Sequence, residues 1–263
     1  MKDHNIKSQS KKSPHPHHRS LASDSISDPN SQKHPTYHLW SHRNTTTNAL
    51  PQLGPPTILV NNAGTVAGQP LLSLAPSQIT ATLTTNLHSH FHTLQTFLPA
   101  LLASPQGGTI VTVASVLGRL GAANLTDYAA AKAGLIALHA SLRAELTAEE
   151  APAGSGNVRM VLVTPGQLGT GLFAGVQTPS SFLGPVVEAV ELARAVVAVV
   201  DAGESGEVNL PLYTGWVWVL EGLPGSLRRV VRWASGVDGA MGGFVGAGGR
   251  GGGAAAAAGR KEM

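Results

Sequence analysis

TILVNNAG, at residues 57–64, is the stretch of this 263-residue sequence that decides its fold. Four residues suited to a buried strand are followed by two asparagines, an alanine and a glycine, a pattern typical of a strand that ends in a turn. Apolar residues at helical spacing then occupy 77–102, and Pro76 favours a helix start just before them. The chain therefore passes from strand to helix at this point.

The alternation of strand and helix continues towards the C-terminus. Strand-like runs occur at 109–114, 158–163 and 207–212, and helical patterns lie between them at about 127–148 and 186–200. Sheets whose strands alternate with helices are typically parallel and covered on both faces. The sequence therefore predicts an α/β fold built on a parallel sheet.

The regions on either side of this core have a different composition. Residues 1–54 are polar and rich in His, Ser and Lys, whereas residues 239–263 consist largely of Gly and Ala. Neither region has the apolar periodicity of a buried helix or strand. We therefore expect disorder in 1–54 and 239–263, and one folded domain at 55–238.

The charge of the chain is unevenly distributed. Residues 1–44 contain seven of the 18 Lys and Arg residues but three of the 15 acidic residues, so the net charge of +3 arises there. The predicted domain is close to neutral, and we expect no nucleic-acid partner. The absence of cysteine excludes disulfides and thiolate metal ligands. Without an apolar run of ~18 residues or a secretory signal, we expect a cytoplasmic protein that could also associate with membranes.

Tyr128 and Lys132 are the first candidates for catalytic chemistry. They are four residues apart in the helix expected at 127–148, so their side chains share one face. An adjacent ammonium favours the phenolate form of a tyrosine, which suits proton transfer. Such a pair alone is more often a solvated helix surface. Ser115, however, ends the preceding strand, where open α/β sheets place their ligand sites.

Four features now stand in a characteristic order: NNAG at 61–64, Asn86, Ser115 and YAAAK at 128–132. With them the chain resembles the short-chain dehydrogenase/reductase family. The resemblance implies a Rossmann-like, doubly wound parallel sheet whose strands correspond to the family's fourth to seventh. It also implies a nicotinamide-dependent oxidoreductase that interconverts a small-molecule alcohol and a carbonyl compound.

The resemblance assigns a role to each matching residue. Tyr128 would be the general acid and base, and Ser115 would bind the reacting oxygen. Lys132 would lower the pKa of Tyr128 and hold the nicotinamide ribose. Asn86 would support a water relay to Lys132. Asp127, which precedes the tyrosine, is interpreted as a helix cap.

The resemblance also implies a binding site for NADP or NAD, with both cofactors left open. The turn after the first strand and the loop after the third would line the cofactor together with Tyr128 and Lys132. The residues concerned are Asn61, Ala63 and Gly64 in the turn, and Pro165, Gly166, Leu168 and Thr170 in the loop.

One family feature has no counterpart in this sequence, because no glycine precedes Gly54. Family members begin with a glycine-rich turn whose backbone N–H groups bind the pyrophosphate. We expect that the first βαβαβ part has been lost or replaced, as a mispredicted gene start would cause. The sheet would then be incomplete, the strand at 57–61 would have an unpaired edge, and cofactor binding would be weakened. The alternative hypothesis is a catalytically impaired remnant that acts through protein association.

The segment after the last strand is rich in aromatic, aliphatic and basic residues. Residues 213–233 could contact a membrane surface peripherally or cover a substrate pocket, or form a C-terminal helix that packs on the core with its arginines in water. Residues 173–233 resemble family branches that act on lipid-like, retinoid-like or steroid-like substrates. The helix bearing Tyr128 and Lys132 is a surface for a homo-oligomer in this family.

His88 and His92 are four residues apart in a predicted helix, a spacing at which two histidines can bind zinc. With no third ligand nearby, we expect no metal site.

Overall fold

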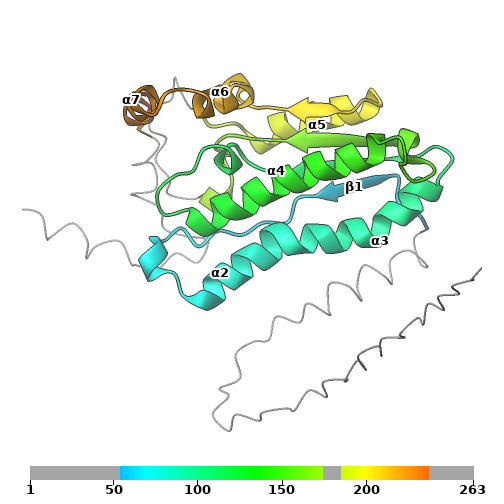
Figure 1. Cartoon of the computed structure of the whole chain (residues 1–263), viewed down its shortest axis with the longest axis horizontal. Coiled ribbons are helices and arrows are strands. Elements are labelled where there is room, and N and C mark those ends of the chain that lie inside the picture. Colours follow the sequence, from blue (N-terminus) through cyan, green and yellow to red (C-terminus); the bar gives the residue numbers. More distant parts are fainter. Residues whose placement is uncertain (1–53, 174–184, 237–263) are drawn as a thin grey trace, which may run out of the picture. The chain divides into compact units, whose positions relative to one another are not determined.

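Four parallel strands form the centre of the structure, in the order β1-β2-β3-β4. The computed structural model describes residues 54–173 and 185–236, which all lie in the compact unit Tyr37–Met263. The strands are β1 (Ile58–Asn61), β2 (Gly108–Val113), β3 (Val158–Val163) and β4 (Gly206–Val208). Because the strands run in one direction, their carboxyl ends meet at the same end of the sheet (Figure 1).

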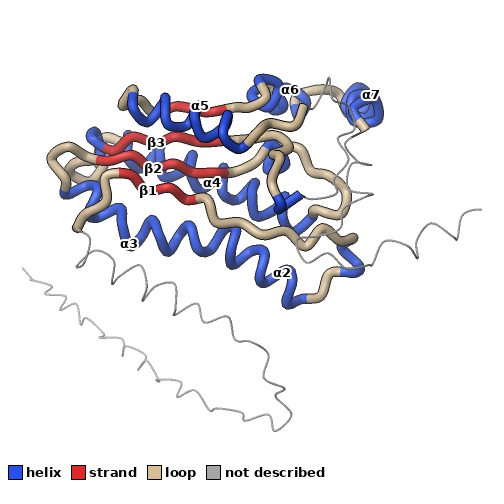
Figure 2. Tube along the Cα trace, turned by 180° about the vertical axis from the view of Figure 1, so that it is seen from behind, coloured by secondary structure: helices blue, strands red, loops and turns tan. Residues whose placement is uncertain are grey.

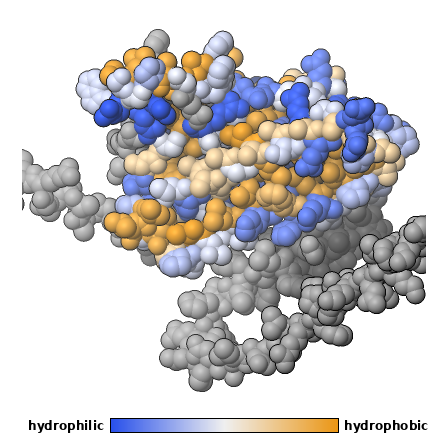
Figure 3. All heavy atoms as spheres, in the orientation of Figure 1, coloured by the Kyte–Doolittle hydropathy of each residue, from blue (hydrophilic) through white to orange (hydrophobic). Residues whose placement is uncertain are grey.

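Helices connect the strands and cover both faces of the sheet. Figures 1 and 2 show α3 and α4 on one face and α5 on the other. The helices are α2 (Pro76–Leu83), α3 (Ser89–Ala103), α4 (Thr126–Thr147), α5 (Ala189–Asp201), α6 (Val217–Glu221) and α7 (Gly225–Ser235). Shorter turns are η1 (Leu71–Ser73), the π-helical η2 (Thr84–His88), η3 (Val116–Gly118), η4 (Ser155–Asn157), η5 (Gly171–Phe173) and η6 (Leu212–Gly215). Hydrophobic atoms lie over α6 and α7 beside hydrophilic ones (Figure 3).

Successive residues of the central strands pack on opposite faces of the sheet. Ile110 of β2 and Met160 of β3 pack with apolar residues of α3 and α4. Their neighbours Val111 and Val161 point the other way and pack against α5. Side chains alternate between the two faces of a strand, and both sets here are almost completely buried. The α/β fold with a doubly wound parallel sheet is therefore confirmed.

Most of the predicted elements are present within one residue of their expected ends, and two differ by more. The strand expected at 207–212 is shorter, because Pro211 has no N–H group to donate and η6 begins at Leu212. The helix expected from 186 begins at Ala189, because Val187 N donates to Gln167 O and stays extended. The disorder expected at 1–54 and 239–263 falls, except for Gly54, outside the described residues.

Among the described residues, β1 is an edge strand. Ile58 and Val60 are 48% and 56% exposed. Val60 pairs with Val111, which is fully buried on the same face of the sheet. The α5 face of the sheet is thus covered over β2 and β3 but open over β1. Within the described ranges, no helix is both long and apolar enough to cross a bilayer.

Candidate active site

Ser115 and Tyr128 lie together beyond the carboxyl end of β2. Ser115 begins η3, and its Oγ accepts a hydrogen bond from the backbone N–H of Leu117 at 3.1 Å. Tyr128 lies in the first turn of α4, close enough to Ser115 for the serine hydroxyl to lower the pKa of the phenol. The two side chains are 5% and 4% exposed. The structure therefore brings the expected hydroxyl and phenol into contact in a site largely shielded from water.

Lys132 joins the same site from the next turn of α4. Its Nζ donates a hydrogen bond to the carbonyl oxygen of Val113, the last residue of β2, at 2.9 Å. The same Nζ lies 5.8 Å from the centroid of the Tyr128 ring. Lys132 is buried, so the ammonium bridges helix and strand inside the protein.

Asn86 is fully buried at the centre of the π-helical turn η2. Its Oδ1 accepts a hydrogen bond from Thr65 N at 2.7 Å, and its Nδ2 donates to Thr65 O at 2.8 Å. A Cβ atom at Gly64 would lie 3.7 Å from Asn86 Oδ1 and 3.8 Å from Lys132 Nζ. Asn86, Gly64 and Lys132 thus meet around one point, and the π-helical turn is a type often found at functional sites.

Burial dominates the proton affinities of the site. It raises the pKa of Tyr128 to about 12, and the hydrogen bond with Ser115 opposes this rise. Burial also lowers the pKa of Lys132 to about 8. We expected Lys132 to lower the pKa of the tyrosine. The pKa of Tyr128 is instead raised, because burial desolvates the phenol.

The loop after β3 lies beside the Ser115 turn. Pro165 O accepts a hydrogen bond from Val116 N at 2.9 Å, and Gly166 N donates to Leu210 O at 2.7 Å. A Cβ atom at Gly166 would be 2.9 Å from Pro211 Cδ, so a side chain there would force a shift. Further along this loop, Leu168 pairs with Val187 ahead of α5, and its O accepts from Thr170 N at 2.8 Å. Pro165 and Gly166 therefore border the site directly.

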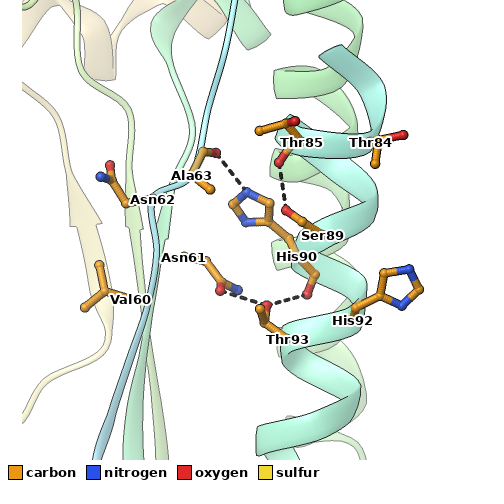
Figure 4. A pocket seen from close by; sticks show the side chains of 10 residues that line it. All are labelled: Val60, Asn61, Asn62, Ala63, Thr84, Thr85, Ser89, His90, His92 and Thr93. Carbon is orange, nitrogen blue, oxygen red and sulfur yellow. Dashed lines mark hydrogen bonds between the residues drawn. The ribbon is translucent and has the colours of Figure 1, made fainter. Parts of the chain in front are cut away.

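A pocket of about 240 Å³ opens between the end of β1 and the helical stretch opposite (Figure 4). Asn61 Oδ1 accepts a hydrogen bond from Thr93 at 2.8 Å, and His90 Nε2 lies 3.4 Å from Ala63 O. Burial lowers the pKa of His90 to about 4, so its ring is neutral at pH 7. Asn61 Nδ2 and His90 Nδ1 are buried without a hydrogen-bond partner. Buried polar atoms without a partner are uncommon in folded proteins and mark this turn as unusual.

Several contributors to the site could not be read from the sequence. Val113 and Thr65 act through backbone atoms, which leave no signal in side-chain identity. Gly118 lets η3 approach α4, since a Cβ atom there would be 2.8 Å from Lys132 O. Phe173 meets the Tyr128 ring edge to face at 5.6 Å.

Asp127 does not cap α4 as expected. The capping position falls on Leu125, whose side chain makes no capping bond. Asp127 lies inside the first turn, buried, with neither carboxylate oxygen hydrogen-bonded. Its charge there is compatible with the positive end of the helix dipole.

Comparison with known proteins places these features in a family. The family model for short chain dehydrogenases matches residues 39–180, more than half of the chain. The uncharacterized oxidoreductase TDA5 of Saccharomyces cerevisiae is 43% identical over 129 residues, which are 49% of this chain and 38% of that protein. Retinol dehydrogenase 10 of Homo sapiens is 41% identical over 124 residues, 47% of this chain and 35% of that protein. The chain thus spans less than two fifths of the length of these relatives.

A solved structure shows the same similarity in three dimensions. It is the crystal structure of a short chain dehydrogenase from Burkholderia cenocepacia in complex with NADP, with a TM-score of 0.59 and 25% sequence identity. The match covers 73% of this chain and 76% of that one. Together with the parallel sheet and the family match, this likeness identifies the chain as a member of the short chain dehydrogenase family.

Proposed function

We propose that the chain interconverts an alcohol and a carbonyl compound with NADP or NAD, and that Tyr128 is its acid–base residue. The observation that carries this proposal is the buried contact of Tyr128 with Ser115, one helical turn from Lys132. Family membership supports the reaction class. The nicotinamide, when bound, supplies or accepts the hydride, and the protein positions the substrate and moves the proton.

The proton passes between Tyr128 Oη and the substrate oxygen. With a pKa raised to about 12, Tyr128 holds its proton at pH 7 and is ready to donate it to a carbonyl oxygen during reduction. The Ser115 hydroxyl donates a second hydrogen bond to that oxygen. In the oxidation direction, Tyr128 first gives up its own proton, and the phenolate then takes the hydroxyl proton of the alcohol.

Lys132 and Asn86 hold the site together around this step. The ammonium has three donors, and its bond to Val113 leaves others for the hydroxyls of a ribose. Asn86 is a positioning residue that fixes the turn after β1 through Thr65. Its Oδ1 can accept a second hydrogen bond, from a relay water. Asn61, Ala63 and Gly64 on one side and Pro165, Gly166, Leu168 and Thr170 on the other complete the proposed cofactor site.

The proposed substrate is lipid-like, with retinoids as the first class to test. The similarity to retinol dehydrogenase 10 supports this choice. Tyr128 also lies in an apolar cluster with Val66 and Leu125, next to Phe173. An apolar carbon skeleton would gain free energy from contact with such surroundings. The homo-oligomer, the cytoplasmic location and the weakened cofactor binding stay predictions.

The test is a titration of the full chain with NADPH and NADH by calorimetry, followed by an assay with retinal and with a small polar ketone. Saturable binding and reduction of retinal are the expected results. Activity on the small ketone alone would contradict the substrate class. If neither cofactor binds saturably, the alternative of an impaired remnant that acts through protein association replaces the enzyme proposal.

Two tyrosine variants make the assignment of Tyr128 specific. Tyr128→Phe removes the proton donor, and we expect kcat to fall about 10²- to 10⁴-fold with a modest change in cofactor affinity. Tyr37→Phe is the control, because it makes the same substitution at a tyrosine outside the proposed site. Equal losses in the two variants would contradict the role of Tyr128.

A further inference from the structure

Helix α7 is amphipathic, and its apolar side faces solvent. Leu227, Val230, Val231 and Ala234 recur at spacings of three and four residues, which places them on one face. Arg228, Arg229 and Arg232 occupy the opposite face. Leu227, Val230 and the adjacent Trp233 are 48%, 57% and 83% exposed.

One hydrogen bond attaches α7 to the loop before α4. Arg232 Nη2 donates to the carbonyl oxygen of Gly121 at 2.8 Å, and Val231 and Arg232 are half-buried. The other two arginines, Arg228 and Arg229, are exposed. A surface helix normally buries its apolar stripe and exposes its polar face. Helix α7 instead leaves most of its apolar stripe uncovered along with these two arginines.

The neighbouring elements extend the apolar surface. Four more large apolar side chains of η6 and α6, or next to them, are exposed: Leu212, Trp216, Trp218 and Val219. We call these four, with Leu227, Val230 and Trp233, the α6–α7 surface. Figure 3 shows hydrophobic atoms over these helices beside hydrophilic ones. Three of the four tryptophans in the sequence belong to this surface, and large exposed apolar patches mark interaction sites.

We propose that the α6–α7 surface docks on the face of an anionic lipid bilayer, with α7 lying in the plane of the membrane. Tryptophan favours the interface between headgroups and acyl chains. Arginines on the polar side of an amphipathic helix attract anionic headgroups, and α7 contains three arginines and no acidic residue. A second copy would present the same uncompensated positive charge, so charge favours the anionic lipid.

This contact lies next to the proposed active site. Gly121, which Arg232 holds, belongs to the loop between η3 and α4. That loop connects Ser115 to Tyr128. If the proposed function holds, a bilayer on the α6–α7 surface would lie near the loop that carries the site, although docking itself requires no activity.

The docking is tested with the full chain and vesicles of phosphatidylcholine, with and without phosphatidylserine. We expect co-sedimentation with the anionic vesicles, weakened by salt, and a blue shift of tryptophan fluorescence. Arg228→Gln with Arg229→Gln should lower partitioning about thirtyfold, since each arginine near the surface contributes a factor of about five. Replacing Trp216, Trp218 and Trp233 by serine should abolish both signals.

Matched variants separate docking from general effects. Arg143→Gln with Arg194→Gln removes two exposed arginines of α4 and α5, and Phe91→Ser removes an exposed aromatic ring of α3. These controls should bind anionic vesicles like the parent protein, and all variants should keep its melting temperature. The proposal is overturned if the parent protein does not bind, or if the controls lose binding to the same degree. Concentration-dependent self-association through this surface without lipid binding would assign it to a second copy instead.

Discussion

At the scale of a residue, Lys132 combines a positive charge with burial inside the protein. Its ammonium is buried and donates a hydrogen bond to the carbonyl of Val113. Burial lowers its pKa to about 8 from a usual 10.5. Such a group costs stability at neutral pH, and sites that carry such costs are commonly functional.

The cost of this buried amine depends on pH. Because the folded state holds the Lys132 proton less tightly than the unfolded state, it binds fewer protons between pH 8 and 10.5. The free energy of unfolding therefore rises with pH across that window, by about 3 kcal/mol for a shift of this size. In Lys132→Met this contribution disappears. Denaturant unfolding of both proteins is measured from pH 7 to 10.5. The free energy of unfolding of the parent should rise relative to that of the variant, and parallel pH profiles would contradict the assignment.

At the scale of elements, the contact of η3 with α4 determines how the site is assembled. η3 follows Ser115, and α4 carries Tyr128 and Lys132. The two elements approach so closely at Gly118 that only a hydrogen atom fits between the backbones. The glycine therefore sets the separation of the serine from the helix-borne pair.

A methyl group at Gly118 tests this contact. Gly118→Ala places a Cβ atom 2.8 Å from the backbone of Lys132, which forces η3 and α4 apart. We expect a loss of about 1–3 kcal/mol in unfolding free energy and a fall in kcat. Gly121→Ala is the control, because nothing lies within 4 Å of a Cβ atom there. Thermal unfolding compares the two, and equal melting temperatures would show that the contact is not tight.

The sequence predicts elements better than it predicts contacts. The strand at 158–163 has the expected bounds, and α4 differs by one residue at each end, because long periodic patterns report burial directly. The π-helical turn around Asn86 was not foreseen, since its residues fit an ordinary helix equally well. The hydrogen bond of Lys132 to the carbonyl of Val113 was not foreseen either, because every residue has a backbone carbonyl and only the fold decides which one lies near the ammonium.

At the scale of the whole molecule, the sheet is asymmetric in its covering and in its polar content. The α5 face carries a polar contact between Arg159 and Thr109 at the amino ends of β3 and β2, whereas the α3–α4 face holds a buried histidine, His139, which contacts Thr112 at 3.0 Å. Burial lowers the pKa of His139 and of His90 to about 4. Both rings are therefore neutral in the folded protein at pH 7.

This polar content predicts a sensitivity to acid. Between pH 6.5 and 4 the unfolded chain binds protons at these histidines and the folded protein does not, so stability present above pH 6.5 is lost as the pH falls. His139→Asn can keep a hydrogen bond to Thr112 without the titrating group, and its stability should fall less over this range. His88→Asn, which changes an exposed residue, is the control. The test compares the free energies of unfolding of all three proteins at pH 7 and pH 5. An equal loss of stability in all three would refute the prediction.

The turn that carries Ser115 is held on two sides, by the bond from Val116 N to Pro165 O and by the contact of Gly118 with α4. A group clamped in this way keeps its place during thermal motion of the surrounding loops. Little reorganisation free energy then remains to be supplied when a substrate oxygen arrives, since the dipoles that meet it are already oriented. If the site is preorganised in this way, a rise in temperature should loosen the surrounding loops while the distance between the serine hydroxyl and the phenol stays nearly constant.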